Sequence, residues 1–320
     1  MKILKRSIAT ALLVFCAGFA QAQPYPNRLI TIIVPLSLGT GGDILARIFG
    51  AKLSDRLGVK VIVDNKPGAG SIVGIDAAAR APGDGYTLLM APTSFALQPI
   101  LDKAGYDVFK SFAPVCLIAT GELVFAVSEN TAAKTVKEFI ALAKSKPGEL
   151  SYVSIGNGSP QHLAMELLKM DAGIDVLHVP YKDTASAIRE LASGHVNSMI
   201  VPVYTIAPLA QAGRARVLAT LNTERSPVFT TAPSLKEEGF PNVDVVVWNG
   251  VMVPAATPPD IVARLNGELN AILALPDIKD LLAKQGFVPA GGTAQRFSDL
   301  IKSDYARWTR AIAAAKIKAY

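Results

Sequence analysis

Cysteine and histidine are scarce in this chain of 320 residues, which has two of the first and three of the second. Cys16 lies in a short apolar run near the N-terminus and Cys116 stands alone in the remainder, so we expect no internal disulfide. His162, His178 and His195 stand far apart in the sequence, without the H-x-x-x-H spacing or the cysteine partner of a metal site. The sequence therefore predicts neither a metal ion nor another cofactor.

Long apolar runs and basic stripes are also lacking. Beyond residue 22 no run approaches the ~20 apolar residues that a membrane span requires. Lysine and arginine form no stripe interleaved with aromatic residues, so a nucleic-acid partner is not expected.

Residues 1–22 have the pattern of a secretory signal peptide. Three basic residues precede a short apolar run, which ends in the small-residue pattern AQA at positions 20–22. The alternative, a membrane-spanning helix, is disfavoured because the run is too short. We predict cleavage after Ala22 and a periplasmic protein.

From residue 29 the sequence alternates strand-like and helix-like segments. A β-branched run over 29–35 lacks polar alternation, which is typical of a strand buried on both faces, and apolar residues at helical spacing follow over 44–58. The alternation restarts near residue 122 and continues to residue 221. Three further helices are expected over 259–275, 278–285 and 294–316.

Two such units in one chain predict an α/β fold with two lobes. We expect lobe 1 to contain residues 23–118 plus 222–320 and lobe 2 to contain residues 119–221, with the C-terminal helices packed on lobe 1. Ligands of such sheets bind outside the carboxyl ends of the strands, so two facing lobes would share one cleft.

Two glycine-rich loops lie at expected strand ends, each just before a helix. The first is LSLGTGGD, Leu36–Asp43, and the second is SIGNGSPQH, Ser154–His162. The first is not a P-loop, because no Gly-Lys-Ser/Thr follows, and not a dinucleotide fingerprint, because Ile44 takes the third glycine position. Free N–H groups at a helix N-terminus attract an anion. For the first loop alone, a tight turn that needs glycine for steric reasons is an equally good explanation.

Two further loops add hydroxyl groups and charges. APTSFALQ supplies Thr93 and Ser94, and VPYKDTAS supplies Tyr181, Lys182, Asp183 and Thr184. The four loops together predict a ligand site. The predicted ligand-binding residues are Leu36, Ser37, Leu38, Gly39, Thr40, Gly41, Gly42, Asp43, Thr93, Ser94, Ser154, Gly156, Asn157, Gly158, Ser159, His162, Tyr181, Asp183 and Thr184.

These loops belong to a longer series of motifs. In order they read YPNRLITIIVP, GGDILAR, DNKPGAGSIVG, APGDGYTLL, FAPV, SKPGELSYVSIGNGSPQHLAMEL, AGIDVLHVPYK, ELASGHV and RARVLAT. The series resembles Bug-type proteins, the extracytoplasmic solute-binding proteins of tripartite tricarboxylate transporters, from about Tyr25 to the final helix.

The resemblance implies a type II-like periplasmic binding protein whose two lobes close on a small carboxylate. It implies that loops 36–43 and 154–162 grip one carboxylate, partly through ordered waters. It also implies two membrane subunits as partners in uptake coupled to an ion gradient.

The chain departs from the family pattern at two places that bear on the substrate. Leu36-Ser37-Leu38 stands where the family usually has Phe-Pro-Ala, and Asp183 stands where it usually has glycine. A carboxylate at position 183 would repel a second anionic group and could accept a hydrogen bond from an amine or hydroxyl. The sequence therefore names no particular tricarboxylate or dicarboxylate.

Other roles remain open alternatives. Asp43 is either a first-turn acid favoured by the helix dipole or a holder of a bridging water or ligand amine. A hydrolase would use Ser154 or Ser159 with His162 and Asp183, but GNGSP is not the G-x-S-x-G elbow, and a helix cap and polar cleft lining explain the same residues. We predict a monomeric carrier with no catalytic residues; a sensor that presents its ligand to a receptor kinase is the other reading.

Overall fold

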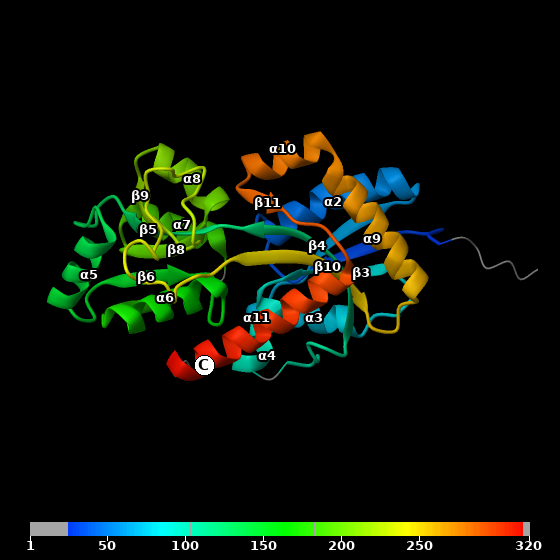
Figure 1. The fold of residues 1–320 in the computed structure, drawn as a ribbon, viewed down its shortest axis with the longest axis horizontal. Coiled ribbons are helices and arrows are strands. Elements are labelled where there is room, and N and C mark those ends of the chain that lie inside the picture. The colour runs from blue at the N-terminus through cyan, green and yellow to red at the C-terminus, as the bar shows by residue number, and fades with distance from the viewer. Residues whose placement is uncertain (1–24, 103, 182, 316–320) are drawn as a thin grey trace, which may run out of the picture.

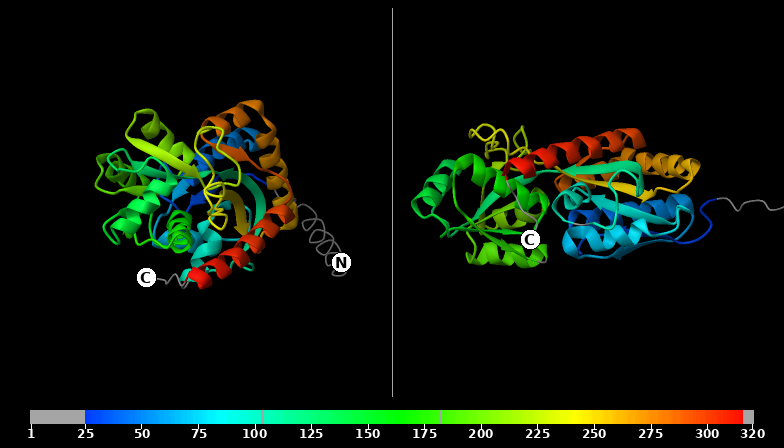
Figure 2. Two further views of the ribbon diagram at one scale, coloured as in Figure 1. Left: turned by 60° about the vertical axis from the view of Figure 1, so that its left-hand side comes forward. Right: turned by 90° about the horizontal axis from the view of Figure 1, so that it is seen from below.

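The computed structural model describes residues 25–315 apart from residues 103 and 182. The predicted signal peptide, residues 1–22, and Lys182 lie outside the described residues. Two lobes lie side by side, each built on one sheet with helices on both faces (Figures 1 and 2). The predicted two-lobe α/β fold is confirmed. Within the described part of the chain, no helix is long and apolar enough to cross a membrane.

The sheet of lobe 1 mixes parallel and antiparallel strands. In spatial order its strands are β11 (Phe287–Pro289), β4 (Phe112–Gly121), β10 (Val247–Pro254), β3 (Thr87–Pro92), β1 (Ile30–Val34) and β2 (Val61–Asn65). β1 pairs in parallel with β2 and β3, and Ile32 stands opposite both Val63 and Leu88. β10 comes from late in the chain and inserts antiparallel between β3 and β4, with Gly250 opposite Ala91.

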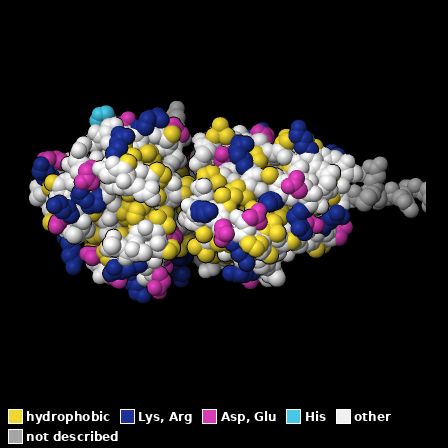
Figure 3. Space-filling model, turned by 90° about the horizontal axis from the view of Figure 1, so that it is seen from above, with side chains coloured by type: hydrophobic (Ala, Val, Ile, Leu, Met, Phe, Trp, Pro, Cys, Tyr) yellow, Lys and Arg dark blue, Asp and Glu magenta, His cyan; other side chains and the backbone are white. Residues whose placement is uncertain are grey.

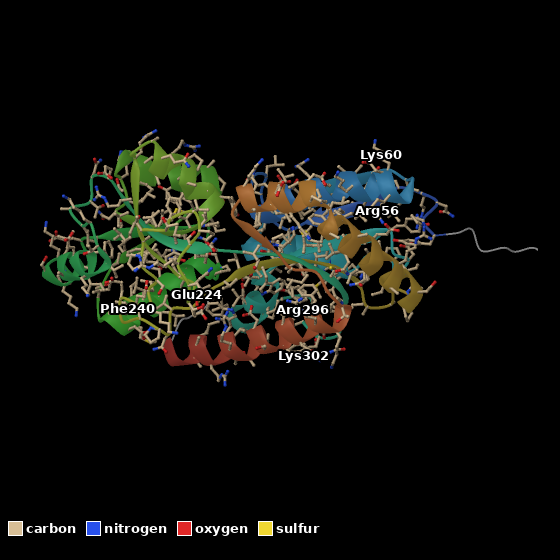
Figure 4. All side chains as sticks on the ribbon, turned by 45° about the horizontal axis from the view of Figure 1, so that its top comes forward. Arg56, Lys60, Glu224, Phe240, Arg296 and Lys302 are labelled. Carbon is tan, nitrogen blue, oxygen red and sulfur yellow. The ribbon has the colours of Figure 1, made fainter. Side chains whose placement is uncertain are left out.

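Helices cover both faces of this sheet because β1 is apolar on both sides, as the sequence predicts. Ile32 packs with Phe49, and Ile33 packs with Ile75 on the opposite face. The first face carries α2 (Gly41–Leu57), α9 (Pro259–Ala274) and α10 (Pro276–Lys284), and the second carries α3 (Ile72–Ala79), α4 (Ser94–Leu101) and the first half of α11 (Ala294–Ala315). Arg56, labelled in Figure 4, joins α2 to α9 through a 2.6 Å ion pair with Glu268.

The sheet of lobe 2 follows the same plan. Its strands, in spatial order, are β7 (Leu177–Pro180), β6 (Ser151–Ser154), β8 (Ser198–Pro202), β5 (Leu123–Ser128) and β9 (Ala215–Thr220). One face is covered by α5 (Val136–Ser145) and α6 (Pro160–Ala172), and the other by α7 (Thr184–Ser193) and α8 (Val203–Gln211). Phe125 of β5 packs toward α5 and α6, and Val124 packs toward α7 and α8.

β4 and β10 connect the lobes, and Figure 1 shows both running between them. Only Glu122 separates β4 from β5, which belongs to the other sheet. Val245, just before β10, packs in the core of lobe 2. A pair of extended strands is the place where two lobes can rotate against each other with few changes elsewhere.

The C-terminal part of the chain contacts both lobes. α9, α10 and the first half of α11 pack on lobe 1 as predicted, whereas Trp308 and Ile312 of α11 join the core of lobe 2. Leu235 and Val243 join that core too, and Phe240 lies beside it (Figure 4). The predicted lobe boundaries stay a prediction, and these contacts favour counting residues 222–246 with lobe 2.

Candidate functional site

A cavity of about 910 Å³ lies between the lobes. Its walls come from the segments that follow β1, β2 and β3 in lobe 1 and β6, β7 and β8 in lobe 2. These segments lie at the carboxyl ends of parallel strands, where α/β sheets bind ligands. Hydrophobic side chains gather on both lobes beside the boundary between them (Figure 3). A cavity of this volume suits a small organic molecule.

Most of the predicted ligand-binding residues line this cavity. They are Leu36, Ser37, Thr40, Gly41, Gly42, Thr93, Ser94, Gly156, Asn157, Gly158, Ser159, His162, Tyr181, Asp183 and Thr184. Leu38, Gly39, Asp43 and Ser154 do not line it, for reasons that lie in how the two glycine loops are held.

The loop before α2 is held by a buried carboxylate. Asp43 is only 4% exposed and accepts hydrogen bonds from the Gly39 N–H at 3.0 Å and the Asn65 amide at 3.1 Å. Arg47 pairs with the same carboxylate at 2.9 Å. Burial would raise the pKa of Asp43, but the hydrogen bonds from Arg47, Gly39 and Asn65 outweigh it and lower the pKa. Asp43 thus holds the loop, while Leu38, 70% exposed, points into solvent.

The loop before α6 is held by hydroxyl and imidazole groups instead. Ser159 caps the helix, accepting from the His162 N–H at 3.2 Å, and its hydroxyl donates to the Gly156 carbonyl at 2.8 Å. The Gly158 N–H donates to Nδ1 of His162 at 3.2 Å. Ser154 is fully buried, and its Oγ lies 2.7 Å from Nε2 of His178. These groups support the loop from behind.

This geometry does not favour the hydrolase alternative. Among the described residues, no hydrogen bond joins Ser159 to an imidazole, and Ser154, which does contact His178, does not line the cavity. Asp183 caps α7 through 2.7 Å and 2.9 Å bonds from the Ser186 N–H and hydroxyl. A nucleophile, a base and an acid are therefore not aligned in the cavity.

Several helices begin at the cavity, among them α2, α4, α6 and α7. The first N–H groups of a helix have no partner within it and carry partial positive charge. Within the described part of the chain, the N–H groups of Gly42 and Gln161 have no hydrogen-bond acceptor. No described residue that lines the cavity is a lysine or an arginine. The cavity can therefore attract an anion through backbone donors.

Each glycine loop faces a different element across the cleft. The Gly41 N–H donates to the Tyr204 hydroxyl of α8 at 2.9 Å, and the Tyr204 ring stacks on Phe287 with 4.9 Å between centroids. Burial raises the pKa of Tyr204 to about 12. A Cβ atom on Gly158 would lie 2.7 Å from Cδ1 of Leu101, at the end of α4. The lobe 1 loop thus faces α8 of lobe 2 across the cavity, and the lobe 2 loop faces α4 of lobe 1.

Sequence reasoning missed part of the lining. The segment Pro67–Ser71 follows β2, and its PGAG pattern was a usable signal for a loop at a strand end. Ala69 and Ser71 have positive φ values of 45° and 95°, and the Ser71 hydroxyl contacts that of Ser94 at 2.6 Å. Residues in or just after α4, α8 and β10 were missed as well, without any local signal: Gln98, Leu101, Asp102, Tyr204, Thr205, Val247, Trp248 and Asn249.

The sequence matches the TctC family, described as tripartite tricarboxylate transporter family receptor, over residues 45–317. The chain belongs to this family. Protein BugT of Bordetella pertussis (strain Tohama I) is 32% identical over 310 residues, which are 94% of this chain and 95% of BugT. The resemblance to Bug-type proteins is confirmed.

Two solved structures of family members from Rhodopseudomonas palustris are similar over nearly their whole length. Rpa4515, solved with adipate, superposes with a TM-score of 0.88 at 32% identity and covers 92% of this chain and 99% of its own. MatC, solved with bound malate, superposes with a TM-score of 0.85 at 26% identity and covers 90% of this chain and 100% of its own. The family and these neighbours are ligand-binding proteins.

Proposed function

We propose that this receptor-family protein captures a small organic carboxylate in the periplasm and delivers it to a tripartite tricarboxylate-type membrane transporter. The observation that carries the proposal is the convergence of several helix N-termini, those of α2, α4, α6 and α7 among them, on one cavity between the lobes. Adipate and malate, bound in the two neighbours, support a carboxylate ligand. The signal-like N-terminus, with its predicted cleavage site after Ala22, supports export.

The binding step follows from the donors at the cavity. A carboxylate would exchange its hydration shell for the N–H groups of Gly42 and Gln161 and for hydroxyl groups such as Thr184, directly or through ordered waters. Each charge-assisted bond contributes about 1.5–3 kcal/mol net. Asp43 and Ser154 hold the two loops without touching the ligand.

Closure follows because the cavity has walls from both lobes. Contacts such as that of the Gly41 N–H with Tyr204 join the lobes and exist only when they meet. A ligand held by both walls therefore shifts the population toward the closed form. The β4 and β10 strands are the proposed hinge, and the membrane subunits would recognise the closed form.

Calorimetric titration of a ligand-stripped sample against mono-, di- and tricarboxylates tests the proposal. We expect at least one carboxylate of the panel to bind with micromolar or tighter affinity. On its binding the protein should become more compact, which small-angle scattering measures. A folded sample that binds none of a broad panel would contradict carboxylate capture. Uptake of the bound solute in cells that carry or lack the membrane subunits tests delivery separately.

A further inference from the structure

Two glutamine side chains line the cavity, and each leaves one amide atom without a hydrogen-bond partner among the described residues. Gln98 of α4 is 4% exposed and Gln161 of α6 is 6% exposed, so each lobe contributes one. Nε2 of Gln98 and Oε1 of Gln161 are buried and have no hydrogen-bond partner among the described residues. Nearly all buried polar side-chain atoms in proteins have a partner, so each of these two atoms needs one from beyond the described residues, such as a water molecule or a ligand.

The Gln98 amide lies between the two lobes, beside Gly70 of lobe 1 and Gly158 of lobe 2. A Cβ atom on Gly70 would collide with the Gln98 amide, and one on Gly158 of lobe 2 would lie 2.9 Å from its Nε2. Glycine at these two positions leaves the room that the amide occupies. The Ser71 and Ser94 hydroxyls, 2.6 Å apart, line the same side of the cavity, and only one of them can donate to the other. The second hydroxyl proton is available to a ligand.

Charge at the cavity wall does not suit a ligand with two ionised groups. Among the described lining residues, two are acids, Asp102 and Asp183, and none is a lysine or arginine. Hydrogen bonds from the Ser186 N–H and hydroxyl hold the pKa of Asp183 below its usual value, so it stays ionised at neutral pH. The helix N-termini can compensate a carboxylate, but a second carboxylate beside the ionised Asp183 would lie near like charge.

We propose, on the basis of the proposed function, that the ligand carries one carboxylate and one neutral polar group, a carboxamide or a group of similar hydrogen-bonding capacity, and that Gln98 and Gln161 bind the neutral group. A glutamine amide both donates and accepts, so it can pair with a ligand amide through two bonds. The expected ligand thus differs in charge from adipate and malate.

Matched ligands of equal length test this inference on the wild-type protein. The panel contains straight-chain dicarboxylates, the monoamides of the same dicarboxylates, and the monocarboxylates with a methyl group in place of the amide. In each pair the two ligands have nearly the same shape, but the monoamide has a neutral amide in place of one ionised carboxylate. We expect the tightest monoamide to bind at least about tenfold more strongly than its dicarboxylate.

The outcomes separate the two proposals. A dicarboxylate that binds as well as or better than its monoamide overturns this inference and leaves carboxylate capture standing. If only the plain monocarboxylates bind, the neutral group is not recognised and the inference fails as well. If no ligand of any series binds to folded, ligand-stripped protein, the proposed function fails together with it.

Variants then assign the recognition to the two amides. Gln98→Leu and Gln161→Leu should each lower the affinity for the best monoamide roughly tenfold and change the affinity for the matching monocarboxylate less than about twofold. Gln295→Leu, on the exposed side of α11, is the control and should bind like the wild type. An equal loss of affinity for the monoamide and the monocarboxylate in the glutamine variants would mean a structural role for the amides and would overturn the assignment. The comparison of ligands on the wild-type protein remains valid even if one variant fails to fold.

Discussion

The two glycine-rich loops look alike in sequence, but they are built on different chemistry. The loop of lobe 1 is held by a buried carboxylate, Asp43, in the first turn of α2, and its Gly41 N–H is already bonded to Tyr204. The loop of lobe 2 is held by neutral groups, Ser159 and His162, and α6 has no acid in its first turn. The positive end of α2 is therefore partly compensated and that of α6 is not. Similar glycine spacing thus predicts a similar loop shape, but it does not predict the charge at the start of the helix that follows.

The largest expected effect concerns the contact of the lobe 1 loop with lobe 2. A Cβ atom on Gly41 would lie 2.8 Å from the Tyr204 hydroxyl and 3.2 Å from the Phe287 ring. Gly41→Ala should hinder closure and weaken carboxylate binding roughly ten- to hundredfold, the range expected for overpacking. The fold should persist because the tightest contact, that with the Tyr204 hydroxyl, lies between the lobes, and the Phe287 ring of lobe 1 has to shift by only a few tenths of an ångström. Calorimetry and thermal unfolding measure the two effects.

Gly267→Ala in α9 is the matched control, because a Cβ atom there meets nothing within 4 Å. It should bind like the wild type. Unchanged affinity in Gly41→Ala would mean that the contact between Gly41 and Tyr204 is absent from the bound form. The Gly41 N–H of the lobe 1 loop would then be as free to bind a ligand as the N–H groups of the lobe 2 loop.

The second prediction sharpens the difference in what holds each loop. Asp43→Asn removes the charge that Arg47, Gly39 and Asn65 bond, and the free energy of unfolding should fall by about 1.5–3 kcal/mol, the contribution of hydrogen bonds to a charged group. Urea denaturation at pH 7 measures it. Because folding lowers the pKa of Asp43, its stabilisation is present above the unfolded value and is lost only as pH falls through the folded value, so the wild type and the variant should converge in strong acid. A difference that persists there would contradict the charge-based explanation.

The lobe 2 loop should respond to milder acid. Burial lowers the pKa of His178 to about 4, with repulsion from His162 as a further cause, and burial also lowers the pKa of His162. An unfolded imidazole takes up a proton near pH 6.5, so wild-type stability should fall as pH drops from about 6.5 toward 4. His178→Asn should show a shallower fall over that interval in urea denaturation. His195→Asn, at an exposed side chain, is the matched substitution outside the loop. Equal slopes in all three proteins would remove this difference between the loops.

How far the sequence predicts this arrangement depends on the range of the contacts. The buried character of β1, the helices after the parallel strands and the loops at their ends follow from local patterns, and the structure places most predicted loop residues around one cavity. The sequence places Asp43 in the first turn of a helix, and α2 begins two residues earlier at Gly41, although the apolar spacing starts only at residue 44 because glycine disfavours helix interiors and is tolerated in a first turn. Tyr204 and Trp248 reach the cavity only because α8 crosses toward α2 and β10 inserts beside β3. Such placement depends on sheet order, which no local pattern encodes.

The smallest effect separates the hydroxyl groups at the two helix starts. Ser159 accepts a bond from a first-turn N–H of α6, whereas Thr40, which precedes α2, makes no such bond and donates to the Ser37 carbonyl instead. Loss of a helix cap costs about 1 kcal/mol, so Ser159→Ala should lower the free energy of unfolding by about that amount and Thr40→Ala by less. Urea denaturation of both variants in the same buffer measures the difference. If Thr40→Ala lowered the free energy of unfolding more than Ser159→Ala, the turn before α2 would depend on the Thr40 hydroxyl as well as on Asp43. The bonds of the Asp43 carboxylate alone would then not explain how that loop is held.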